Sequence, residues 1–357
     1  MTSRRNLLSA AAGIMFCGCA LQGAAHAQGA RKPVMVRGKR IKTIDVHSHC
    51  IFHEAAALLG DKAGSLTPGV RNSKEAYIVI DERLAAMDKM AIDMEVLSIN
   101  PFWYGMDRDL AAKIVTIQND KLAGLCAAKP DRFAAFASLT MQDPALAVQQ
   151  LETAVKKQGL KGAAIGDRVG PLEFSDPKLH PVWAKAEELG AVLFIHPQGI
   201  PELNDRLKGN GWLGNTVGNP LGTTIALQHL IFEGTLDKYP GLKIVAAHGG
   251  GYLPSYAPRD DHACFVSPPG CNPDIKLKKE PTEYLNQLYF DALVFTPEAL
   301  RHLVAQVGAG QVMLGSDHPY IWEQHPVDHV FATTSLTDAQ KAAILGGNAA
   351  KLFGFKA

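Results

Sequence analysis

Short apolar, β-branched runs alternate with longer segments of helical period from about residue 42 to the end of the chain. The runs of strand length cover residues 43–46, 95–99, 133–138, 162–165, 192–195, 244–247, 289–291 and 312–315. The segments of helical period between them include residues 110–128, 145–157, 181–189, 224–232 and 297–306. Strands that alternate with helices predict an α/β fold with a parallel sheet and helical crossovers. Eight such units favour a (β/α)8 TIM barrel over an open sheet.

The predicted strands are unevenly spaced. Long segments follow the first, fifth and sixth strands, at about residues 51–81, 197–220 and 249–284. All three would lie on the carboxyl-terminal rim of a barrel, where active sites are built. From Leu336 onward the pattern predicts one closing helix with a break at Gly346-Gly347-Asn348. Because no further repeat and no low-complexity linker interrupts the pattern, residues 40–357 are predicted to form a single domain.

The first 27 residues have the pattern of an export signal. Arg4-Arg5 precedes a short apolar run, and Ala25-His26-Ala27 offers a cleavage site. The paired arginines resemble a twin-arginine signal, which predicts a periplasmic protein. The run is too short and too rich in Gly and Ala for a comfortable membrane span, so none is expected in the mature chain. An uncleaved anchor and a lipoprotein attached at Cys19 remain as alternatives.

Composition directs the search for function to a pocket. Hydrophobic residues make up 47% of the 357 residues and charged residues 20%, and the formal net charge is +1. Without a basic excess, nucleic acid is not an expected partner. There are six cysteines but no C-x-x-C pair, which argues against a thiolate zinc site. Cys264 and Cys271 could pair in an oxidising periplasm, or both could be free thiols; spacing does not decide.

Four of the predicted strands end in histidine or aspartate. The first ends in Asp45-Val46-His47-Ser48-His49, and side chains two apart on a strand point to the same side. His196 follows the fifth strand and Asp317 the eighth. His248 follows the sixth, and the three glycines after it leave room for backbone and substrate to approach. Imidazole and carboxylate groups are common ligands of zinc and similar ions, so this pattern predicts a metal centre.

The sequence also resembles the aminocarboxymuconate-semialdehyde decarboxylase branch of the amidohydrolase superfamily from Ile44 to Phe353. The resemblance rests on Ile44-Asp45-Val46-His47-Ser48-His49, Phe194-Ile195-His196-Pro197, Ala247-His248-Gly249-Gly250-Gly251, Tyr289-Phe290-Asp291-Ala292-Leu293-Val294, Val312-Met313-Leu314-Gly315-Ser316-Asp317 and Gly347-Asn348-Ala349.

This resemblance implies roles for seven residues. His47, His49, His196 and Asp317 would bind one divalent ion, with zinc expected and manganese or cobalt as alternatives. His248 would be the catalytic acid/base, and Asp317 would also belong to the catalytic group. Arg259, and Arg71 in the variable segment, would bind the carboxylate of a small-molecule acid. In this family one such arginine can come from a neighbouring subunit, which would imply a homodimer.

The expected function is a metal-dependent, non-oxidative carboxy-lyase that acts on an unsaturated or aromatic acid. A zinc-type ion lowers the pKa of bound water from about 15.7 to about 7, and His248 could take up and return its proton. The alternative is a metal-dependent hydrolase (ester, lactone, amide or carbon–carbon bond) or a hydratase on the same site. A vestigial binding protein is a third hypothesis, against which the intact ligand set argues.

One departure from the family pattern concerns the substrate. The related decarboxylases have tryptophan after the His-Pro of strand five, where this chain has Gln198-Gly199. A stacking surface for the substrate could instead come from Trp103, Tyr104 or Trp212.

Overall fold

The computed structural model describes residues 32–60, 78–271 and 274–356. The predicted export signal and Arg71 lie outside these ranges. No helix among the described residues is long and apolar enough to cross a membrane.

All eight predicted strands are present, with bounds that differ by a few residues. They are β3 (Ile44–His49), β4 (Met94–Ser98), β5 (Phe133–Ala135), β6 (Gly162–Ile165), β7 (Val192–Ile195), β8 (Lys243–Ala246), β9 (Leu288–Asp291) and β10 (Val312–Met313). The longer helices are α2 (Ile80–Lys89), α3 (Arg108–Ala128), α4 (Pro144–Lys156), α5 (His180–Leu189), α6 (Asn219–Phe232), α8 (Leu253–Val266) and α10 (Pro297–Val307). The shorter ones are α1 (His53–Ala56), α7 (Thr235–Lys238), α9 (Pro268–Cys271), α11 (Pro326–Ala332), α12 (Asp338–Ala342) and α13 (Asn348–Phe353).

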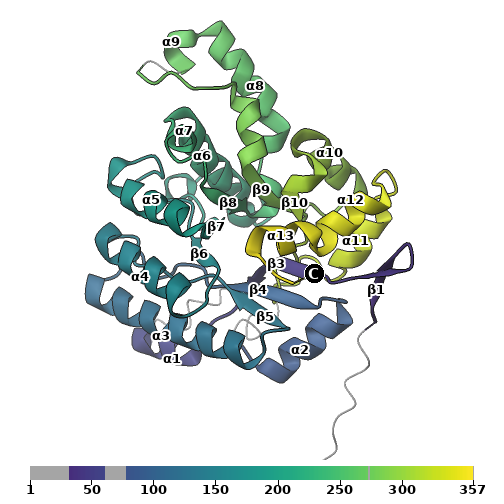
Figure 1. The fold of residues 1–357 in the computed structure, drawn as a ribbon. Helices are drawn as coiled ribbons and strands as arrows, with labels where there is room; N and C mark the ends of the chain where they lie inside the picture. Colours follow the sequence, from purple (N-terminus) through teal and green to yellow (C-terminus); the bar gives the residue numbers. More distant parts are fainter. Residues whose placement is uncertain (1–31, 61–77, 272–273, 357) are drawn as a thin grey trace, which may run out of the picture.

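Two parallel sheets join into a closed barrel. One sheet has the order β3-β4-β5 and the other β10-β9-β8-β7-β6. Parallel bridges between Ala137 and Ala163 and between Ser48 and His318 connect their edges. The backbone N–H of Val46 also donates to Leu314 O at 2.9 Å. The (β/α)8 barrel is therefore confirmed, with its helices arranged around the strands (Figure 1).

Aromatic side chains fill the barrel interior. Phe136 and Phe194 stack with ring centroids 5.4 Å apart, and Phe353 of α13 packs against Phe136 at 5.6 Å. Inward-facing residues from the strands complete this buried cluster. Because the interior is packed, the chemistry must lie at its carboxyl-terminal end.

A β-bulge in β3 directs two histidines into the barrel. The register pairs Asp45 with Glu95 and then Ser48 with Leu97, so Val46 and His47 together face the single residue Val96. Strict alternation would place Asp45, His47 and His49 on one face. The extra residue instead leaves Asp45 beside Glu95 on the outer face, whereas His47 packs against Phe194 inside.

Three features differ from the sequence predictions. Residues 34–41 form an unpredicted hairpin of β1 (Val34–Val36) and β2 (Lys39–Ile41). The expected break at Gly346-Gly347-Asn348 is instead a π-helical turn, Ala343–Gly347, between α12 and α13. It needs glycine at residue 346 because a Cβ there would lie 1.9 Å from Lys42 O.

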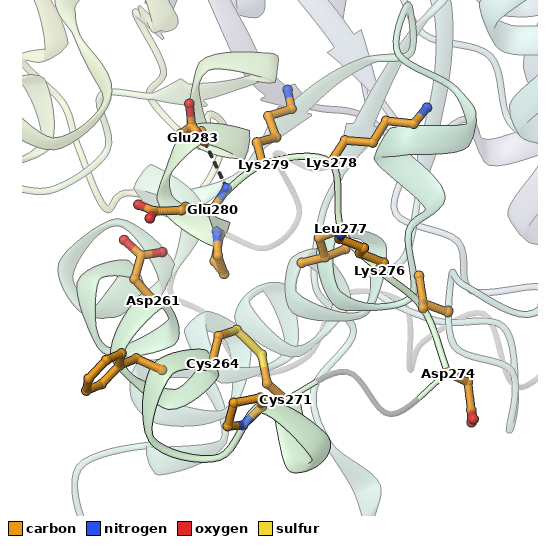
Figure 2. Close-up of a pocket in the computed structure, with 14 residues that line it drawn as sticks. Asp261, Cys264, Cys271, Asp274, Lys276, Leu277, Lys278, Lys279, Glu280 and Glu283 are labelled. Carbon is orange, nitrogen blue, oxygen red and sulfur yellow. Dashed lines mark hydrogen bonds between the residues drawn. A yellow bond between two sulfur atoms is a disulfide. The ribbon is translucent and has the colours of Figure 1, made fainter.

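The third difference is the segment after β8, which is largely helical although no helix was predicted there. Helices α8 and α9 rise away from the barrel (Figure 1). Pro254 lies in the first turn of α8, where its missing N–H costs little, and Pro258 lies within the helix. A disulfide joins Cys264 to Cys271, which settles the alternative left open by their spacing. Figure 2 shows this disulfide beside a pocket. The pocket measures about 720 Å³, and none of the predicted site residues in the described ranges lines it.

Candidate metal centre

The four predicted ligands converge at the carboxyl-terminal end of the barrel. His47 and His49 lie on β3, His196 follows β7 and Asp317 follows β10. One ligand atom from each lies within 4.8 Å of all the others, and all four residues are buried. The structure thus brings together the whole predicted set.

Hydrogen bonds fix the imidazole tautomers in the form that a metal requires. His47 donates from Nδ1 to Asp291 Oδ2 at 2.6 Å, and His196 donates from Nδ1 to Pro197 O at 3.0 Å. The Ser98 hydroxyl donates to Ser48 O, so it accepts from His49 Nδ1, which lies 2.8 Å away. Each ring therefore turns an Nε2 lone pair toward the shared centre.

Those lone pairs face one another at short range. His47 Nε2 lies 3.0 Å from His49 Nε2, and Asp317 Oδ1 lies 3.2 and 3.0 Å from the two nitrogens. His196 Nε2 is buried and has no hydrogen-bond partner among the described residues. Neutral lone pairs repel at such distances unless a cation or proton lies between them. The donor set therefore fits one divalent metal ion.

The surroundings set the charge of each group. Burial lowers the pKa of His49 to about 4, against the opposing effect of Asp317. Burial and the neighbouring imidazoles hold the pKa of His196 well below its usual value. Burial alone would raise the pKa of Asp317, but His47 and hydrogen bonds hold it well below the usual range. Two neutral imidazoles and a carboxylate are the forms that bind a cation.

His47 differs from the other two histidines. Burial would lower its pKa, but Asp317 and Asp291 outweigh burial and raise it to about 10. A proton and a metal ion therefore compete for the same lone pair of His47.

Asp291 at the end of β9 supports the centre from behind. It is fully buried and accepts from His47 Nδ1, from His248 N at 2.8 Å and from Gly249 N at 2.8 Å. Burial alone would raise the pKa of Asp291, but the hydrogen bond from His47 helps to lower it. Such a carboxylate orients a metal-binding imidazole. Asp291 does not cap the following helix α10, whose N-cap is Thr296.

His248 lies beside the quartet of predicted ligands, His47, His49, His196 and Asp317, and it lines a cavity. Its Nε2 is 3.9 Å from Asp317 Oδ2, and its ring centroid is 5.1 Å from those of His47 and His196. The cavity measures about 150 Å³. Its lining residues are Asn215, Thr216, Asn219, Pro220, His248, Phe295, Asp317 and Trp322.

The glycines after His248 make room for the protein itself. At Gly250, with φ +78°, a Cβ would lie 2.6 Å from the Phe290 ring. At Gly251, with φ +67°, it would lie 2.2 Å from Pro220 O. The expected close approach of backbone is present, but these glycines make room for protein atoms rather than for substrate.

Of the two predicted substrate-binding arginines, only Arg259 lies among the described residues. Arg259 is exposed on α8 and does not line the cavity, and Arg71 lies outside the described residues. Trp103 is buried and donates to Leu139 O at 2.8 Å, which is a packing role. Trp212 is 50% exposed and stacks on Trp322 at 5.4 Å, so it reaches the cavity wall. Tyr104 does not line this cavity.

The family model described as amidohydrolase matches residues 44–355 of the chain. The chain belongs to this amidohydrolase family. The amidohydrolase is 33% identical over 280 residues to 2-amino-3-carboxymuconate-6-semialdehyde decarboxylase of Dictyostelium discoideum, covering 77% of this chain and 76% of the relative. It is 32% identical over 286 residues to γ-resorcylate decarboxylase of Rhizobium radiobacter, covering 76% and 86%.

Solved structures show the same fold. The 5-carboxyvanillate decarboxylase from Sphingomonas paucimobilis matches with a TM-score of 0.80 at 27% identity, covering 88% of this amidohydrolase and 100% of that chain. A dihydroxybenzoic acid decarboxylase from Polaromonas sp. JS666, with bound manganese and the inhibitor 2-nitroresorcinol, matches with a TM-score of 0.76 at 27% identity, covering 89% and 98%. These matches confirm the resemblance found in the sequence, and the chain is an enzyme of the amidohydrolase superfamily.

Proposed function

We propose that this amidohydrolase is a metal-dependent, non-oxidative decarboxylase of small aromatic or unsaturated carboxylic acids. The observation that carries the proposal is the buried quartet of three histidines and one aspartate with His248 at its edge, opening on a cavity. The decarboxylase relatives support this reaction in preference to hydrolysis.

We propose zinc as the ion, with manganese as the second candidate. Three imidazole nitrogens favour a borderline metal such as zinc, whereas a carboxylate also suits manganese, the ion in the Polaromonas structure. When bound, the ion would supply Lewis-acid polarisation of a water or of a substrate oxygen. His47, His49, His196 and Asp317 would hold it.

His248 supplies the proton chemistry in this proposal. In a decarboxylation the bond to the carboxylate carbon breaks, carbon dioxide leaves, and the remaining carbon keeps the electron pair and takes a proton. His248 lines the cavity next to Asp317, so its ring can deliver that proton. Asp291 fixes the backbone of His248 through the N–H bond and thereby limits where the ring can lie.

The cavity supports an aromatic substrate. Its volume of about 150 Å³ is of the size that holds one benzene-like ring. Phe295 and Trp322 form apolar walls, and Asn215, Thr216 and Asn219 offer polar atoms for ring substituents.

The described lining contains no arginine or lysine to receive a substrate carboxylate. A charged carboxylate entering a partly buried site needs such a partner. We propose that Arg71 and an Arg259 from a second copy supply it. Arg259 is exposed on α8, and no hydrogen bond or ion pair occupies it among the described residues. The proposal implies a homodimer.

Decarboxylation can be tested with the purified, zinc- or manganese-loaded protein. Hydroxybenzoic acids and aminocarboxymuconate semialdehyde would be supplied in D2O, with carbon dioxide release and product mass as readouts. A decarboxylase should release one carbon dioxide per product and leave one deuterium on the carbon that lost the carboxylate.

The His47→Ala/His49→Ala variant is the matched control. It should contain no metal by elemental analysis and release no carbon dioxide. Ester or lactone cleavage without carbon dioxide would instead establish the hydrolase alternative. A wild type without metal, not activated by zinc, manganese or cobalt, would contradict the whole proposal.

A further inference from the structure

A network of buried polar side chains lies on the outer face of β3, behind the two histidines. Asp45 and Glu95 are 0% exposed and Arg83 is 4% exposed. Burying three ionisable side chains is costly, and apolar side chains of similar volume would often be as stable or more so. Their presence here therefore needs a reason other than the stability of the barrel.

Arg83 of α2 binds three groups at once. Its Nη1 donates to His49 O at 2.7 Å, its Nη2 to Ser48 Oγ, and its Nε to Glu95 Oε2 at 2.6 Å. Burial alone would raise the pKa of Glu95, but Arg83 and His318 hold it at about 2, so the carboxylate is ionised. The guanidinium thus fixes the carboxyl-terminal end of β3 to the neighbouring strand.

Asp45, at the beginning of the bulge, is held by hydrogen bonds from β3 itself and from the segment after β10. Asp45 Oδ1 accepts from His47 N at 2.9 Å, and Asp45 Oδ2 accepts from the Ser316 hydroxyl at 2.5 Å. Glu95 Oε1 accepts from His318 Nδ1 at 2.8 Å. Ser316 and His318 flank Asp317, so the same network holds both the bulged strand β3 and the segment that carries Asp317.

We infer that Arg83, Asp45 and Ser316 are positioning residues that hold the β3 bulge and the Asp317 segment in register, so that the metal ligands converge. Without the bulge, the alternation of β3 could not place Ile44, Val46, His47 and His49 all inside the barrel. This inference rests on the metal centre of the proposed function and not on the reaction that is proposed to take place there.

The test compares Arg83→Lys and Ser316→Ala with wild type. Lysine keeps the positive charge beside Glu95 but cannot reproduce the three-way guanidinium contact. The cobalt dissociation constant would be measured by chelator competition, together with the visible spectrum of the cobalt-loaded protein. We expect affinity to fall roughly 10–100-fold in each variant and the cobalt bands to shift, because ligand orientation changes.

Asn119→Ala is the matched control. Asn119 is also buried and binds backbone atoms of the barrel, but at the segment after β5 and not at β3. It donates to Ser138 O at 3.0 Å and accepts from Ser138 N at 2.8 Å. It should lower the melting temperature of the metal-free protein as much as the network variants do, with cobalt affinity and spectrum unchanged.

Wild-type cobalt affinity in both network variants would overturn the inference. So would an equal loss of affinity in Asn119→Ala, because the effect would then be general destabilisation. A wild type that binds no cobalt would remove the metal centre and this inference together. A wild type that binds cobalt and responds as expected, but releases no carbon dioxide from any acid, would remove only the proposed reaction.

Discussion

His248 and Asp317 both adopt left-handed backbone conformations, with φ of +56° and +63°. Such conformations are uncommon for residues other than glycine and persist where the surroundings fix them. His248 N donates to Asp291, and Asp317 N donates to His47 O at 2.9 Å. Phe295, which also lines the cavity, has φ +65°. The clustering of these conformations around one cavity is typical of a functional site.

The two residues should respond differently to replacement by alanine. His248→Ala should keep fold and metal and lose about 10²–10⁴ in turnover, the range of acid/base catalysis. Asp317→Ala should weaken metal retention because a ligand is lost. Elemental analysis and carbon dioxide release separate these effects. Full turnover in His248→Ala would show that the acid/base assignment is wrong.

Sequence position predicted a metal centre because strand ends meet on one rim whatever the loops do, and the resemblance to the family supplied the choice of four ligands. The tautomers could not be predicted, since they depend on Ser98, Pro197 and Asp291, which come from three separate elements. The cavity wall was also missed in part. Trp322 and Phe295 carry no sequence signal. Trp322 stacks on Trp212, a predicted aromatic candidate, and Phe295 contacts Trp322.

At the scale of elements, hydrophobic pattern predicted strands well and local irregularities poorly. All eight barrel strands follow from short apolar runs, but the β3 bulge does not, because it depends on hydrogen bonds with β4, with α2 and with the segment after β10. The helices predicted from the sequence did not include α8, which contains two prolines. These prolines are tolerated because Pro254 lies in the first turn and tertiary packing stabilises the helix.

At the scale of the whole molecule, two parallel sheets close into one barrel, and the site draws its residues from the carboxyl-terminal ends of β3, β7, β8, β9 and β10. The Cys264–Cys271 disulfide in the projecting α8–α9 segment supports an oxidising compartment. Together with the Arg4-Arg5 motif, it is the basis on which we propose twin-arginine export to the periplasm.

Export can be tested with Arg4→Lys/Arg5→Lys. The variant should remain in the cytoplasm with its signal attached, whereas wild type should reach the periplasm and begin at Gln28. Alkylation in denaturant without reductant would label two cysteines in the exported protein, Cys50 and Cys126. All six should label in the retained variant. A lipidated Cys19 on the exported protein would establish the lipoprotein alternative, and equal export of the variant would exclude the twin-arginine route.

The proposed dimer makes a prediction about mixed subunits. Arg259→Ala should raise KM roughly 10–100-fold, because a charged hydrogen bond to the substrate carboxylate is lost. Arg259→Ala and His248→Ala would each be nearly inactive alone at low substrate. If Arg259 acts across the interface, a mixed dimer contains one complete site, with His248 from one chain and Arg259 from the other.

Random mixing should then restore roughly a quarter of wild-type activity, since half of the dimers are mixed and each has one of two sites intact. Co-refolding of the two variants, with light scattering to measure the oligomer, gives the readout. If Arg259 instead served its own chain, each mixed dimer would combine one His248→Ala site with one Arg259→Ala site, and mixing would restore nothing. A monomer with normal KM in Arg259→Ala would leave Arg71 as the carboxylate-binding residue and remove the need for a second subunit.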